Sequence, residues 1–175
     1  MLYVVEMDLP DQSLLEEWHH WYAGHLQKLL SIPGFLSAQR FQSTASTASP
    51  YTTVYTVASA QVITGAIYRE KAGPASSGKW RNLMTNWKRN LLEGIDHAPD
   101  VPLGGWLAIM DRHAPAAPPV PPHMTRLRPV GLDCSIIERG ILAGAGRVPP
   151  PAVREEADWL LRVCRPLTPY LTPGR

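Results

Sequence analysis

Residues 13–41 decide the fold of this chain; they read SLLEEWHHWYAGHLQKLLSIPGFLSAQRF. At about 100° per residue, the apolar side chains of this stretch gather on one face of a helix. The helix ends at Pro33-Gly34 and leads directly into a strand. His25 lies within the apolar face, where an ionisable side chain is least expected. The stretch therefore predicts an amphipathic helix followed by a strand, with His25 as a candidate pocket residue or catalytic base.

The length allows one full domain, or a small domain with an appendage, and the composition argues against several functional classes. The formal net charge is +2, 18% of the 175 residues are charged, and the basic residues are scattered, which argues against nucleic-acid binding. Two cysteines, Cys134 and Cys164, are too few for a disulfide framework or a Cys-x-x-Cys zinc site. Residues 1–10 lack a secretory signal and no apolar run is long enough for a bilayer. We therefore expect a soluble, cytoplasmic protein that binds no membrane.

Apolar periodicity and turn signals predict a strand–helix–strand–strand–helix–strand order in the first part of the chain. After the first helix, for which Ser13 and Glu16 predict a capping box, a short helix is expected over residues 59–69 and another over 80–95. The predicted strands are residues 2–9, 35–42, 51–58 and 103–111. This order is that of the ferredoxin-like fold, an α+β unit with both helices on one face of a four-stranded sheet. The uncovered face predicts a second subunit, packed sheet against sheet around a cavity.

A proline-rich segment separates this unit from the rest of the chain. The sequence holds 18 prolines, and residues 114–122 read APAAPPVPP, which cannot lie inside a helix or a sheet. We therefore expect a ferredoxin-like domain over residues 1–112, a linker over 113–123 and a C-terminal extension over 124–175. Within the extension, the prolines at 149–151 predict the start of a helix over about 152–165.

The first unit carries one distinctive run of residues, namely Trp21-Tyr22-x-x-His25 followed by Leu29-Leu30-x-x-Pro33-Gly34-Phe35-x-Ser37-Ala38-x-Arg40-Phe41. With this run the chain resembles the dimeric α+β barrel superfamily, and within it the EthD-like and related proteins. The resemblance covers residues 1–112. It implies a homodimer with a cavity inside the barrel, and a histidine near the end of the first helix, here His25, that moves protons at the cavity mouth.

Four side chains are candidates for acid–base chemistry: His25, Tyr55, Arg40 and Glu6. A neutral imidazole titrates near the operating pH, which suits His25 as the base; the alternative is a core histidine bonded to backbone. Glu6 and Arg40 would accept a proton and hold an anionic oxygen in the cavity, or else form a structural ion pair between neighbouring strands. Tyr55 would donate a hydrogen bond to a carbonyl oxygen, or is an ordinary strand aromatic.

Aromatic side chains provide the predicted substrate-binding surface, although large rings also pack in cores; they are Trp21, Tyr22, Tyr51 and Trp106. The sequence has no Gly-x-Gly-x-x-Gly, P-loop or Gly-x-Ser-x-Gly motif and no carboxylate cluster, so we expect no cofactor and no metal. The leading hypothesis is a cofactor-independent acid–base enzyme, an isomerase, cyclase or lyase, acting on a small cyclic, aromatic or polyketide-like molecule. The alternatives are a cofactor-independent monooxygenase on a phenolic substrate and a non-catalytic dimer that binds a small ligand.

Overall fold

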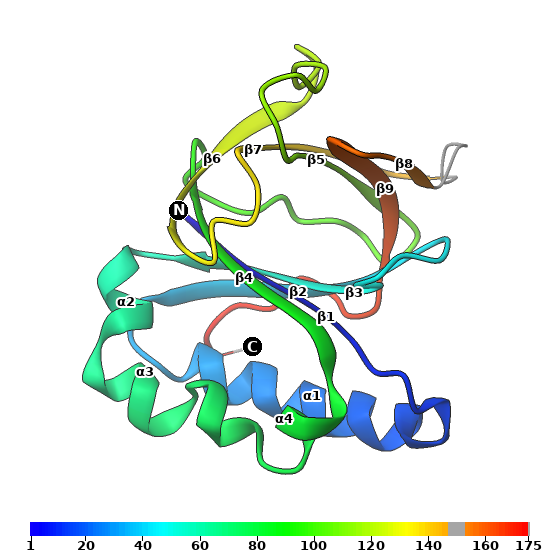
Figure 1. Cartoon of the computed structure of the whole chain (residues 1–175). Helices are drawn as coiled ribbons and strands as arrows, with labels where there is room; N and C mark the ends of the chain where they lie inside the picture. Colours follow the sequence, from blue (N-terminus) through cyan, green and yellow to red (C-terminus); the bar gives the residue numbers. More distant parts are fainter. Residues whose placement is uncertain (147–152, 175) are drawn as a thin grey trace.

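A computed structural model describes residues 1–146 and 153–174, and within them the chain is mainly β (Figure 1). One antiparallel sheet contains the strands β1 (Leu2–Asp8), β2 (Phe35–Ser43), β3 (Tyr51–Val57), β4 (Thr85–Glu93), β5 (Trp106–Arg112), β6 (Thr125–Leu132), β7 (Glu138–Gly144), β8 (Val153–Glu156) and β9 (Trp159–Pro166). The helices are η1 (Gln12–Leu14), α1 (Leu15–Leu30), α2 (Ala60–Thr64), α3 (Ala66–Lys71), η2 (Pro74–Ser77) and α4 (Trp80–Leu83).

Eight of these strands close into a barrel. Their order is β2-β3-β1-β4-β6-β7-β5-β9, and β9 pairs again with β2. This closing seam joins residues 41–43 to residues 164–166 in antiparallel register. β8 pairs with β9 as a hairpin beyond the barrel. Closure gives each barrel strand two neighbours, which removes the exposed edges of an open sheet.

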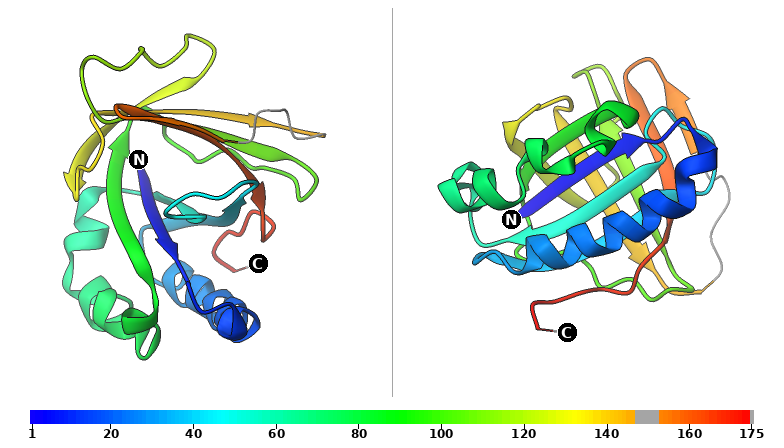
Figure 2. Two further views of the ribbon diagram at one scale, coloured as in Figure 1. Left: turned by 45° about the vertical axis from the view of Figure 1, so that its right-hand side comes forward. Right: turned by 90° about the horizontal axis from the view of Figure 1, so that it is seen from below.

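The helices cover one wall of the barrel. Figures 1 and 2 show them together outside β2, β3, β1 and β4, whereas β5, β6, β7 and β9 form the opposite wall. Successive side chains of β1 point to opposite faces of the sheet, as in any strand. Leu2 and Val4 therefore lie in the barrel core, while Tyr3 and Val5 lie in a second core beneath the helices.

The amphipathic helix α1 forms as predicted, but its start is different. The Asp11 carboxylate accepts hydrogen bonds from the Ser13 N–H at 3.0 Å and the Ser13 hydroxyl at 2.6 Å. Asp11 thus caps the 3-10 turn that precedes α1, and the predicted Ser13–Glu16 capping box is wrong. After α1 the chain turns at Gly34, whose φ is +97° and where a Cβ would lie 2.4 Å from Cγ2 of Val62. Only glycine fits this turn without strain.

Side chains fill the barrel. The core draws apolar residues from all around the sheet, among them Leu2, Val4, Phe41, Val54, Leu92, Leu107, Ile109, Leu127, Ile141 and Cys164. The space left among them is about 10 Å³, which is room for a single water molecule. An eight-stranded barrel is just wide enough to be packed in this way.

This architecture overturns the predicted fold class. The chain is not a ferredoxin-like α+β unit that pairs into a dimeric α+β barrel, because one chain closes eight strands into a mainly β barrel. The resemblance to the dimeric α+β barrel superfamily and its EthD-like members is wrong for the same reason. The sheet face that was expected to meet a second subunit is the barrel interior, and β5, β6, β7 and β9 of the same chain cover it.

Three predicted elements also change. The helix predicted over 80–95 is the single turn α4 followed by the strand β4. The strand predicted over 103–111 is β5, which pairs with β7 and β9 and not with β1. The helix predicted over 152–165 is the β8–β9 hairpin from Val153 onward, and residue 152 lies outside the described residues. For the two predicted helices, pairing within the sheet overrides local helical spacing.

Candidate functional site

A small pocket lies between α1 and the outer face of the barrel, and we call it the helix-side pocket. Its residues come from β1, α1, β3, the α2–α4 segment and β4: Tyr3, Val5, Met7, Trp21, Tyr22, His25, Leu29, Tyr55, Tyr68, Ala72, Ser77, Met84 and Trp87. The space inside is about 20 Å³, enough for water but not for a ring. A larger ligand therefore requires the aromatic side chains to move apart.

His25 is the one imidazole in this pocket. Its ring stacks on Trp21, with 4.9 Å between centroids and an interplanar angle of 18°, and meets the edge of Tyr22 at 5.7 Å. Burial, and then the charge of Lys28, lower the pKa of His25 from 6.5 to about 4. The ring is therefore neutral at pH 7, with one nitrogen as donor and the other as acceptor. Neither nitrogen makes a hydrogen bond to any residue that the structure describes.

Four tyrosines add hydroxyl groups to the helix-side pocket. The hydroxyls of Tyr3 and Tyr68 are 3.0 Å apart, and the Thr53 hydroxyl donates to the Tyr22 oxygen at 3.0 Å. Burial raises the pKa of Tyr3 and of Tyr55 well above 10, so these phenols keep their protons. Because Tyr22 accepts from Thr53, its own hydrogen remains available for a neighbouring oxygen. The pocket thus combines a neutral imidazole with neutral phenol donors.

Arg40 and Tyr51 lie beside the helix-side pocket. The Arg40 guanidinium stands 4.2 Å from the Trp18 ring centroid, 4.0 Å from that of Tyr22 and 5.4 Å from that of Tyr51. Its Nη1 is 2.7 Å from Nδ1 of His19, which must accept because an arginine only donates. Burial lowers the pKa of Arg40 to about 10, and burial beside this cation lowers that of His19 to about 4.

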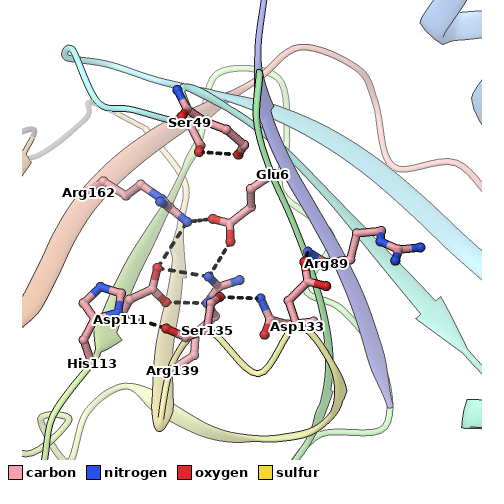
Figure 3. A network of polar contacts seen from close by, with 11 residues as sticks. Glu6, Ser49, Arg89, Asp111, His113, Asp133, Ser135, Arg139 and Arg162 are labelled. Carbon is pink, nitrogen blue, oxygen red and sulfur yellow. Dashed lines mark hydrogen bonds and ion pairs between the residues drawn. The ribbon is translucent and has the colours of Figure 1, made fainter. Parts of the chain in front are cut away.

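Glu6 does not pair with Arg40, because the two side chains lie on opposite faces of the sheet. Glu6 points into the barrel, where it belongs to a buried charge cluster with Asp111, Arg139 and Arg162 (Figure 3). Arg139 donates from Nη2 to Glu6 at 2.8 Å and from Nε to Asp111 at 2.5 Å. Arg162 contacts Glu6 and lies 3.3 Å from Asp111. With two charges of each sign, the charge cluster is balanced.

Trp106 lies far from the predicted site. It is on the outer side of β5, in a third apolar cluster with Ala108 and Met110, and its ring leaves no space for a side chain at Gly144. Of the predicted site residues, the structure gathers Trp21, Tyr22, His25 and Tyr55 around the helix-side pocket and places Arg40 and Tyr51 next to it; Glu6 and Trp106 lie elsewhere.

Sequence reasoning missed several residues of both sites. Tyr3 and Tyr68 line the helix-side pocket, and Arg139 and Arg162 complete the charge cluster. The signal for the two arginines was a charge within an apolar strand, as in Leu160-Leu161-Arg162-Val163-Cys164. Such a charge is rarely buried unless a partner neutralises it.

Residues 1–146 and 153–174 contain no group of three His, Cys, Asp or Glu side chains placed to hold a metal ion. None of the helices in these residues is long and apolar enough to cross a membrane. Comparison of the chain with protein-family models, with curated proteins and with solved structures finds no match.

Proposed function

We propose that this protein binds a small cyclic or aromatic carbonyl compound in the helix-side pocket and catalyses a proton transfer on it without a cofactor. The observation that carries this proposal is His25, a neutral imidazole stacked in an aromatic pocket with no hydrogen bond to the described part of the chain. A packed core histidine is fixed by hydrogen bonds to the chain, whereas the half-buried His25 keeps its ring nitrogens open to water or to a ligand.

The chemistry follows from the two kinds of polar group. The acceptor nitrogen of His25 takes a proton from the carbon next to the substrate carbonyl, and the C–H electron pair forms the enolate. Negative charge then develops on the carbonyl oxygen, where the hydroxyl of Tyr22 or Tyr55 donates a hydrogen bond. Return of the proton to another carbon completes an isomerisation, and loss of a leaving group completes a lyase reaction. A substrate ring held among the aromatic side chains would displace water from the pocket, which strengthens both interactions.

Deuterium incorporation tests this function before the natural substrate is known. The protein is incubated in D₂O with a panel of small cyclic ketones and aryl ketones, and exchange at the carbon next to the carbonyl is followed by proton NMR. Wild type is expected to accelerate exchange for members of the panel, and His25→Gln is expected to slow it by about a hundredfold or more, the usual contribution of a general base.

His20→Gln is the matched control, because His20 lies on the same helix with an exposed side chain. This variant is expected to exchange at the wild-type rate. The proposal fails if wild type exchanges no faster than buffer, or if His25→Gln, shown to be folded by circular dichroism, exchanges as fast as wild type.

A second candidate is binding without catalysis, because the rings of Trp21, Tyr22 and Trp87 around the helix-side pocket suit a planar ligand whether or not His25 acts on it. Binding alone predicts quenching of tryptophan fluorescence by members of the same panel with no deuterium exchange. Oxygenation of a phenol and the homodimer remain predictions from sequence; sedimentation velocity tests the dimer directly.

A further inference from the structure

A surface hollow of about 220 Å³ adjoins the helix-side pocket, and we call it the arginine hollow. Its residues are Arg81 of α4, Trp87 and Arg89 of β4, and Asp133. Trp87 lines both the arginine hollow and the helix-side pocket. A ligand held in the arginine hollow would therefore contact Trp87, which also lines the helix-side pocket.

The two guanidinium groups of the arginine hollow are not neutralised by carboxylates. Within the described residues, neither Arg81 nor Arg89 forms an ion pair. Asp133 is held by backbone: its carboxylate accepts the Arg89 N–H at 2.6 Å, and its own N–H donates to the Arg89 carbonyl at 2.9 Å. Figure 3 shows the Arg89 side chain extending away from the charge cluster in the barrel. Two arginines and one aspartate leave the hollow with a net charge of +1.

A second hollow shows the contrast. It measures about 310 Å³ and contains Arg126 and Arg128 together with Glu93 and Glu138. There Arg128 pairs with Glu93, and Arg126 donates to the Val120 carbonyl at 2.9 Å. In that hollow Arg128 is thus ion-paired and Arg126 is bonded to backbone, whereas Arg81 and Arg89 of the arginine hollow form no ion pair with the described residues, and Arg89 interacts with the neutral Tyr68 hydroxyl.

We infer that the arginine hollow binds the carboxylate of a cyclic or aromatic monoanion, whose ring lies against Trp87 on the way into the helix-side pocket. This inference rests on the proposed function, because it names the class of molecule that reaches His25. A guanidinium fork matches a carboxylate in geometry, and an indole face suits a planar ring. The net charge of +1 fits a carboxylate better than a doubly charged phosphate ester.

Two further observations support a cyclic or aromatic carboxylate as the class of ligand. Arg89 lies close enough to Tyr68 of the helix-side pocket to lower the pKa of that phenol, against the larger effect of burial, which raises it. Nε1 of Trp87, a residue that lines both spaces, is buried without a hydrogen-bond partner among the described residues, so this donor is left for a ligand oxygen once the side chains that bury it move apart. Positive charge and donors thus continue from the arginine hollow towards His25.

Benzoate and benzyl alcohol are the probes, since they share a ring and differ in charge. Ligand-observed NMR titration is expected to give wild type a Kd for benzoate roughly tenfold below that for benzyl alcohol, as for one charge-assisted contact. Arg89→Gln and Arg81→Gln should each weaken benzoate binding and leave benzyl alcohol binding unchanged. Arg128→Gln is the matched control, because this arginine already pairs with Glu93, and it should change neither constant.

The outcomes separate the inference from the proposed function. Equal constants for the two probes, absence of benzoate binding, or benzoate binding that survives both arginine substitutions would overturn the inference. The deuterium assay with neutral ketones judges the proposed function independently. His25→Gln should separate the two activities. In the titration it should still bind benzoate more tightly than benzyl alcohol, and in the deuterium assay it should lose exchange on the ketones.

Discussion

Replacing Arg139 with methionine tests whether this guanidinium holds the charge cluster inside the barrel together. Arg139 is 1% exposed and makes three hydrogen bonds: 2.5 Å and 3.0 Å to the two oxygens of Asp111, and 2.8 Å to Glu6. Methionine keeps much of the apolar length of the side chain but removes the charge and all three donors. Two buried carboxylates then share Arg162 alone.

The expected cost follows from the uncompensated charge. Removing one partner of a buried ion pair costs about 3–5 kcal/mol, because the remaining charge has lost its solvation as well as its partner. We therefore expect Arg139→Met to lower the free energy of unfolding by about 4 kcal/mol. Adding Asp111→Asn restores balance, since Glu6 and Arg162 then neutralise each other, and this second change should recover about 1–2 kcal/mol.

Urea unfolding at pH 7, followed by tryptophan fluorescence and extrapolated linearly to water, measures both effects. Arg128→Met is the control, because its pair with Glu93 is exposed and such pairs contribute about 0–1 kcal/mol. The reasoning is refuted if Arg139→Met costs no more than this control, or if Asp111→Asn makes the double variant less stable than Arg139→Met alone.

Three further changes should shift stability. The folded state holds the pKa of His25 at about 4, so the unfolded chain binds this proton more readily, and the His25 contribution to stability, about 3 kcal/mol, should be lost as pH drops from about 6.5 to 4. Urea titrations should show this pH dependence reduced in His25→Gln, where His19 with its pKa of about 4 still contributes, and kept in full in His20→Gln. Arg40→Lys should cost about 2 kcal/mol in the same titrations at pH 7, because a lysine does not stack on the two rings that Arg40 covers. Gly94→Ala should cost about 2 kcal/mol in thermal unfolding, since φ is +119° and a Cβ would lie 2.4 Å from the Arg126 carbonyl oxygen; a normal melting temperature would contradict this.

The N-terminal elements could be predicted because their signals are local. The strands expected over residues 2–9, 35–42 and 51–58 end within a residue of β1, β2 and β3. The helix between β1 and β2 follows from its apolar face, which needs no knowledge of distant strands. These predictions used contacts between near neighbours in the chain.

The helix predicted over 80–95 was wrong because its spacing is ambiguous. Trp87 and Leu91 are four residues apart, and a separation of four places side chains on one face of a helix and also on one face of a strand. Pairing of β4 with β1 and β6, far away in the sequence, decides for the strand. Leu160 and Cys164, four residues apart within β9, pose the same ambiguity.

The residues of the candidate site could be predicted where they share one element, and could not where distant strands bring them together. His25, Trp21 and Tyr22 share one helix, so their position around one pocket could be anticipated from the sequence. The partner of Glu6 could not, because Arg139 and Arg162 lie more than 130 positions away and only the closed barrel brings them together. A charged residue within an apolar strand predicts that a partner of opposite charge lies nearby, but only the topology of the barrel determines which residue that partner is.

The seam of the barrel has a consequence for synthesis of the chain. Because residues 41–43 pair with residues 164–166, β2 can pair with β3 early, but its other edge has no partner until the ribosome has released β9. Pairings so distant in sequence form slowly, and an open strand edge invites pairing with another nascent chain. We therefore expect the yield of folded protein to depend on how well the edge of β2 is shielded during translation, more than on the stability of the finished barrel.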